Sequence, residues 1–121
     1  MLINLSNHPA AKWNAGQLEQ AQAQYGEVRD LPFPKVDPYA DEAAILQLAH
    51  DYVARAQALL PATGHHAVHL MGEMTLTYAL VQAFRAEGLP CIASTTAREV
   101  AQEADGTKTS VFRFVRFREY K

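Results

Sequence analysis

The stretch AVHLMGEMTLTYALVQAFRAEGLPCIAS, residues 67–94, changes its periodicity twice and thereby decides the fold. Residues 67–71 are largely apolar, as in a buried strand. From Glu73 to Ala86 apolar residues recur at helical spacing, and Gly88 follows as a stop signal. Residues 89–94 are again mostly apolar. A strand, a helix and a second strand in this order predict two parallel strands joined by a helical crossover.

The sequence before this unit repeats the same alternation. A short branched run and a weaker one predict two more strands, separated by a helical pattern rich in Ala and Gln. Three prolines in residues 31–40 then predict an extended loop, and Asp41 is a candidate N-cap for the strongest helical pattern of the chain. The predicted strands are Met1–Leu5, Glu27–Leu31, 67–71 and 89–94, and the predicted helices are Trp13–Tyr25, 42–60 and 73–86.

The C-terminal quarter has a different pattern. Asp105-Gly106 is a strong hairpin-turn signal, and Val111–Phe117 is dense in branched and aromatic residues. These features predict an antiparallel hairpin, although the arm at Arg98–Ala104 is also compatible with a helix. Strict alternation along FRFVRFREYK leaves neither face clean, with arginines and apolar residues on both. Such mixed faces favour a dimer contact over a surface that binds RNA.

Taken together, the elements predict an α/β fold with a single domain over residues 1–121. Strands that alternate with helices give a mostly parallel sheet with helices on both faces. We therefore expect a Rossmann-like three-layer domain that ends in a C-terminal antiparallel hairpin.

Composition excludes several classes of protein. The formal net charge of −2 argues against a protein that coats duplex nucleic acid, which needs a basic surface. No apolar run approaches the ~18 residues of a membrane-spanning helix, and no secretory leader is evident, so we expect a cytoplasmic protein with no membrane partner. The single cysteine, Cys91, lies in an apolar strand pattern and is predicted to be a buried thiol in a reducing compartment.

Polar residues collect where parallel strands are predicted to end. In open α/β sheets, ligands bind beyond the carboxyl ends of the strands. This rule selects three segments as a candidate ligand site: Ser6, Asn7 and His8 after the first strand, Gly72, Glu73, Met74 and Thr75 after the third, and Ser94, Thr95, Thr96 and Arg98 after the fourth.

The chemistry of these segments leaves alternatives open. A helix N-terminus after Gly72 can receive a phosphate, but Glu73 would compete with an anion. Glu73 could accept bonds from a ribose, hold a catalytic water, or only complement the helix dipole. Arg98 could bind a phosphate through two hydrogen bonds from its guanidinium, or pair with a nearby glutamate. His8 could act as a general acid or have only a structural role in the turn.

The sequence predicts neither a cofactor nor a metal site. His65, His66 and His69 do not have an established ligand spacing, and no further cysteine assists them. The motifs of nucleophile-elbow hydrolases, phosphate-loop proteins and dinucleotide-binding dehydrogenases are all absent.

The segments LINLSNHP, HLMGEMTLTYALV, CIASTTAREV and FRFVRFREY, in this element order, resemble small single-domain CRISPR-associated Rossmann-like proteins. These include relatives of the CARF domain and small ring nucleases, and other close relatives are uncharacterised bacterial proteins. The resemblance implies a homodimer that holds a cyclic oligoadenylate across its two-fold axis and cleaves it without a metal ion. It implies that the three strand-end segments contact the ligand, and that Arg98 or His8 stabilises the transition state. The alternatives are an α/β protein that binds or processes another phosphate- or nucleotide-bearing metabolite, and a non-enzymatic adaptor.

Overall fold

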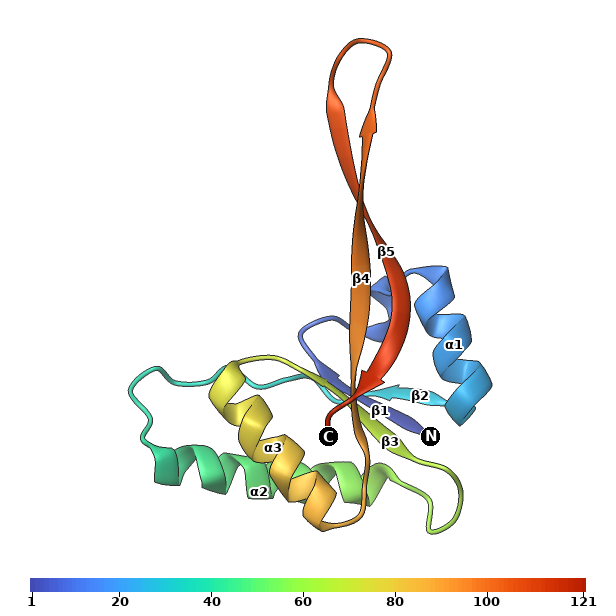
Figure 1. Cartoon of the computed structure of the whole chain (residues 1–121). Helices are drawn as coiled ribbons and strands as arrows, with labels where there is room; N and C mark the ends of the chain where they lie inside the picture. Colours follow the sequence, from blue (N-terminus) through green and yellow to red (C-terminus); the bar gives the residue numbers. More distant parts are fainter.

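The computed structural model describes all 121 residues and contains one five-stranded sheet in the order β2-β1-β3-β4-β5 (Figure 1). The strands are β1 (Leu2–Ser6), β2 (Val28–Asp30), β3 (Ala67–Met71), β4 (Cys91–Gln102) and β5 (Lys108–Glu119). Strands β2, β1, β3 and β4 are parallel neighbours, whereas β5 pairs antiparallel with β4. The predicted α/β class and mostly parallel sheet with a C-terminal hairpin are therefore confirmed.

Helices cover both faces of the sheet. The helices are α1 (Ala15–Tyr25), preceded by the short 3-10 helix η1 (Ala10–Lys12), α2 (Glu42–Leu59) and α3 (Met74–Ala86). Alternate strand residues divide into two cores because successive side chains of a strand point to opposite faces. Ile3 and Leu70 join the larger core under α2 and α3, while Leu2 and Ala67 pack with Ala21 of α1.

Each α-helix begins at a side chain that accepts a backbone hydrogen bond. Asn14 accepts from Gln17 N at 3.0 Å before α1, and Asp41 accepts from Ala44 N at 2.9 Å before α2. Glu73 does the same before α3. Such caps satisfy amides that have no partner inside the helix. The predicted helix starts after Asp41 and near Glu73 are confirmed for this local reason.

The prediction that the fourth strand ends at Ser94 is wrong. Strand β4 continues to Gln102 and stays paired with β5 to its last residue, opposite Lys108. The helical alternative for residues 98–104 is wrong for the same reason. The turn at its end is the predicted one: Gly106 has φ of 89°, and the Asp105 carboxylate accepts from Thr107 N at 3.0 Å.

A β-bulge breaks the strict alternation expected along β5. Thr95 pairs with Arg116 but Thr96 pairs with Phe114, so Val115 is the extra residue. Phe114 and Phe117 therefore lie on the same face, with ring centroids 5.0 Å apart, where simple alternation would place them on opposite faces. The bulge gives the base of the hairpin an aromatic pair that faces α1.

Beyond this bulge the hairpin leaves the body of the molecule. Residues 97–113, which we call the arm, project from the sheet as a two-stranded ribbon (Figure 1). Every residue of the arm is exposed. Because β4 continues into the arm beyond the ends of β1 and β3, the arm rises from the edge of the sheet at which the candidate site was predicted.

Candidate functional site

The strand register places the predicted segments after β1 and β3 side by side. Ser6 and Met71 are direct register partners on these neighbouring parallel strands, and Ile92, two residues before Ser94, is the partner of His69. A cavity of about 240 Å³ opens at this edge. It is lined by Asn4, Ser6, Asn7, Pro9, Asp30, Pro32 and Phe33.

A polar row crosses four adjacent strands beneath this edge. Asn4 Nδ2 donates to Asp30 Oδ1 at 2.8 Å, and Asn4 Oδ1 lies 2.9 Å from His69 Nδ1. His69 Nε2 in turn lies 3.2 Å from the Ser94 hydroxyl. The row therefore runs from an exposed carboxylate on β2, through buried groups on β1 and β3, to a half-buried hydroxyl on β4. We call Asp30, Asn4, His69 and Ser94 the polar row.

The imidazole of His69 is held neutral. Burial, and secondly the charge of nearby His8, lowers the pKa of His69 from 6.5 to about 4. The ring is 2% exposed, and the rings of Trp13 and Phe117 cover it with centroids at 5.0 and 5.8 Å. Because the Asn4 amide oxygen can only accept, Nδ1 carries the hydrogen and Nε2 accepts from Ser94.

The loop after β1 is anchored through the backbone of His8. The His8 carbonyl accepts from Asn4 Nδ2 at 2.8 Å, from Ser6 Oγ at 3.1 Å and from Trp13 Nε1 at 3.2 Å. The side chains of Asn7 and His8 are exposed. A fixed backbone with free side chains can present an amide and an imidazole to a ligand at this edge.

The N-terminus of α3 is already occupied by a carboxylate. Glu73 accepts from Thr75 N at 3.0 Å, from Leu76 N at 2.8 Å and from the Thr75 hydroxyl. These bonds, that from the Leu76 amide above all, lower the pKa of Glu73. The amides expected to receive a phosphate are therefore satisfied within the chain, and Glu73 has the capping role that the sequence allowed.

Gly72 lies in tight contact with the loop after β2. A Cβ atom at this position would meet ring carbons of Phe33, including Cδ2 at 2.6 Å. The glycine is thus explained by close packing at the edge of the site.

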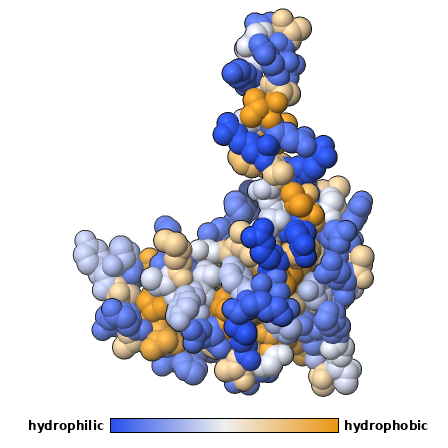
Figure 2. Space-filling model, viewed as in Figure 1, coloured by the Kyte–Doolittle hydropathy of each residue, from blue (hydrophilic) through white to orange (hydrophobic).

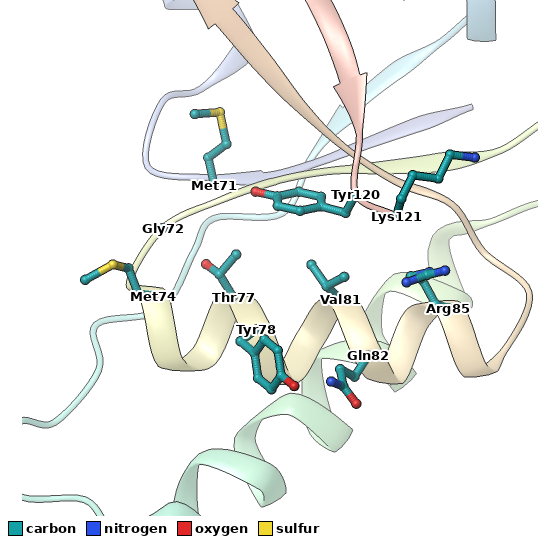
Figure 3. Close-up of a pocket in the computed structure, with 10 residues that line it drawn as sticks. All are labelled: Met71, Gly72, Met74, Thr77, Tyr78, Val81, Gln82, Arg85, Tyr120 and Lys121. Atoms are coloured by element: carbon teal, nitrogen blue, oxygen red, sulfur yellow. The ribbon is translucent and has the colours of Figure 1, made fainter.

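A larger groove of about 810 Å³ adjoins Gly72 and Met74 between α3 and the end of β5 (Figure 3). Arg85 and Lys121 lie at one end of this groove, and Met71 and Met74 at the other (Figure 3). Tyr120 reaches over it and donates its hydroxyl to Leu70 O at 2.7 Å. The groove therefore has an apolar end and a cationic end.

Residues from β4 are divided between the site and the arm. Ser94 belongs to the polar row, and the Thr95 hydroxyl donates to Arg116 O at 3.1 Å. Thr96 is exposed at the base of the hairpin. Arg98 lies on the arm, where its guanidinium donates to Ser110 Oγ at 2.9 and 3.2 Å. At about 3.3 Å of rise per residue, Arg98 is roughly 13 Å beyond Ser94.

Three members of the polar row were not predicted: Asn4, Asp30 and His69. The available signal was a polar residue within an apolar strand, Asn4 in LINLS and His69 in AVHLM. Buried polar groups of this kind need partners, so each implies a network. Which partners they find depends on the register between strands, which no single segment encodes.

The structure contains neither a metal-ligating cluster nor a membrane-spanning helix. No three His, Cys, Asp or Glu side chains lie close enough together to hold a metal ion. None of the helices combines the length and the apolar character required to cross a lipid bilayer.

Comparison with known proteins gives one match. The model of the uncharacterized protein MJ1673 family matches residues 1–118. No curated protein and no solved structure matches the chain.

Proposed function

We propose that this chain, which belongs to the uncharacterized protein MJ1673 family, binds a cyclic oligoadenylate-type nucleotide in a cleft between two copies and cleaves it as a metal-independent ring nuclease. The observation that carries the proposal is the register of β1 against β3, which sets Ser6 beside Met71. It places the exposed Asn7 and His8 next to the turn that begins at Gly72.

The position of this edge in the sheet supports a ligand site. Strand β2 lies on one side of β1 and β3 lies on the other, so the strand order reverses between β1 and β3. Open α/β sheets bind ligands outside the carboxyl ends at such a reversal. We base the proposed nucleotide class on the resemblance in element order to small CRISPR-associated proteins.

The chemistry follows from the groups that remain free. Since Glu73 caps α3, the phosphates would be contacted by Asn7 and His8. In the cleavage step the ribose 2′-hydroxyl gives its proton to water and its oxygen forms a bond to phosphorus. The bond from phosphorus to the 5′-oxygen breaks, and the 5′-oxygen takes a proton. His8 would supply that proton, and the product would carry a 2′,3′-cyclic phosphate. Alignment of the 2′-hydroxyl by the cleft lowers the barrier without a metal ion.

A thermal-shift series on the purified chain tests binding. Cyclic tri-, tetra- and hexa-adenylate are compared with linear oligoadenylate and AMP. A ligand at 100 times its dissociation constant should stabilise the fold by about 2.7 kcal/mol. Asn7→Ala should abolish the shift and His8→Ala should only reduce it, while His50→Ala, at an exposed histidine on α2, should retain it in full. If no cyclic oligoadenylate raises the melting temperature, the proposed ligand is wrong.

Chromatography of the bound ligand tests cleavage separately. His8→Ala should leave the ring intact where the wild type opens it in the presence of EDTA. Arg98→Ala, compared with Arg113→Ala on the same arm, shows whether the arm contributes a group to the reaction. Binding without cleavage would indicate a protein that senses the nucleotide but does not cleave it. A rise in melting temperature with another nucleotide only would favour a different phosphate-bearing metabolite as the ligand.

A further inference from the structure

The arm exposes apolar side chains on both of its faces. Phe112 is 63% exposed, and Val100 and Val111 are more than half exposed. Phe112 lies opposite Arg98, and Val111 lies opposite Glu99, so the two apolar residues of β5 point to opposite faces of the ribbon. Figure 2 shows this mixture of apolar and hydrophilic side chains along the projecting hairpin.

A ribbon of this kind is not stable on its own. An isolated two-stranded hairpin is marginal in water, and packing against another element is what normally stabilises it. Helix α1 covers only the base of the hairpin, where Phe114 is buried. From Ala97 to Gln102 the arm extends over roughly 17 Å at about 3.3 Å per residue. This length exceeds what the body of the same chain covers.

The body carries an apolar surface of matching character. A groove of about 460 Å³ lies between the N-terminal halves of α2 and α3. Leu46 and Tyr78 are exposed in it and Met74 is 83% exposed, while Asp41 and Glu42 form an acidic end. Methionine side chains adapt readily to a docked surface. The groove therefore offers apolar contact and negative charge together.

We propose that the arm of one copy docks in this groove of a second copy, and that the arm of the second copy docks in the groove of the first. We call this reciprocal pair of contacts the clasp. Figure 1 shows the arm projecting away from α2 and α3, so its own groove is out of reach. A two-fold pair of such contacts closes and buries both apolar surfaces. Because Met74 and Thr75 begin α3 just after the turn that follows β3, these contacts lie beside the carboxyl edge of the sheet.

Individual arginines of the arm support docking in this groove. The arm has three Lys and Arg against three Asp and Glu and is neutral overall, whereas the rest of the chain has eight against ten. Arg98 has only the neutral Ser110 as a partner, and Arg113 makes one exposed ion pair with Glu99 at 3.3 Å. Such an exposed pair contributes little. The Asp41 and Glu42 end of the groove would compensate these arginines.

The oligomeric state of the nucleotide-free chain tests the clasp. Light scattering after size exclusion should give a dimer for the wild type. Phe112→Asp in the arm and Leu46→Asp in the groove should each give a monomer, with a dimer dissociation constant raised at least tenfold. Circular dichroism should show that both variants are folded. Ala54→Asp, at an exposed position of the same helix as Leu46, should remain a dimer. A monomeric wild type, or dimers that both aspartate variants leave intact, would overturn the proposal.

Disulfide trapping tests the reciprocal arrangement directly. Chains with Phe112→Cys are mixed with chains with Leu46→Cys under oxidising conditions, in a Cys91→Ala background. A mixed disulfide between the two chains supports the clasp. Cross-links only between two copies of Phe112→Cys would show that arms pair with arms and would overturn it. No nucleotide is present, so failure here is separate from failure of the proposed ligand.

Discussion

His69 Nε2 lies 3.2 Å from Ser94 Oγ, at the end of a hydrogen-bonded row that starts at the Asp30 carboxylate. The imidazole accepts from this hydroxyl because its other nitrogen must donate to Asn4. The relationship links β3 to β4 at the point where β4 leaves the body for the arm. The protonation state of one buried ring therefore bears on both the stability of the sheet and the placement of Ser94.

The buried His69 makes stability fall in acid. The unfolded ring takes up a proton below its ordinary pKa of 6.5, whereas the folded ring stays neutral down to a pKa of about 4. Its contribution is complete above pH 6.5 and is lost as the pH falls from 6.5 to 4, with a limit on the order of 3 kcal/mol. Urea denaturation at half-unit pH steps measures the free energy of unfolding through this window.

Comparison with His69→Gln isolates this contribution from the carboxylates that titrate nearby. The variant is less stable at pH 7, but its stability should change less between pH 6.5 and 4.5 than that of the wild type. His50→Gln removes an exposed histidine and should reproduce the wild-type slope. Equal slopes for the wild type and His69→Gln would contradict a buried neutral imidazole.

Asn4→Ala should destabilise the protein by about 3 kcal/mol. The change leaves the buried His69 Nδ1 without its acceptor and removes one of the donors to the His8 carbonyl. An unsatisfied buried group costs about 1–3 kcal/mol. The free energy of unfolding in urea measures the loss. Asn7→Ala, at an exposed position of the same loop, should change it by less than about 0.5 kcal/mol.

The boundaries of most elements were predictable because their signals are local. Asp41 and Glu73 begin α2 and α3 by accepting amide hydrogen bonds within three residues. The Asp105-Gly106 turn is likewise determined by its own two residues and Thr107. Caps and turns of this kind require no knowledge of the remainder of the fold.

The length of β4 was not predictable in this way. Residues 95–102 have no apolar alternation of their own, and they form a strand because β5 pairs with them across the turn. The bulge at Thr95 and Thr96 is equally non-local. The predicted place of Arg98 in a strand-end loop depended on the shorter strand, so the structure moves this residue onto the arm.

The adjacency of the segments after β1 and β3 was predictable, but the polar row beneath them was not. The rule for parallel strands brings the segments after β1 and β3 together without reference to any particular sequence. The polar row depends instead on Asn4 facing Asp30 across one pair of strands and His69 across another. That juxtaposition is determined by strand order and register, which the sequence pattern leaves open.

Cys91 should react slowly in the native protein. Burial raises the pKa of its thiol to about 12, and the thiolate is the reactive form. Modification by Ellman's reagent at pH 8 should therefore follow unfolding and accelerate with urea. A chain with Cys91→Ala and Ala54→Cys has an exposed thiol on α2 instead and should react at least a hundredfold faster. Rapid reaction of the wild type without urea would show that the thiol is accessible.

Gly72→Ala should destabilise the protein by about 1–3 kcal/mol, the range expected when a packed site is overfilled. The added Cβ would meet the ring of Phe33, which must then move away from the turn that begins α3. In Phe33→Ala the ring is absent, so the same Gly72→Ala change should be nearly neutral. The free energies of the two single variants and the double variant form a cycle that measures this coupling.

Gly16→Ala is the matched control for this cycle. In α1 the new Cβ would meet only the Asn14 side chain at 3.7 Å, an ordinary contact. Alanine is favoured over glycine in a helix by up to about 1 kcal/mol, so this variant should be more stable than the wild type. If Gly72→Ala cost as much in the Phe33→Ala background as alone, the ring would not be what excludes a side chain at Gly72. The close contact between the loop after β2 and the turn after β3 would then not explain why position 72 is a glycine.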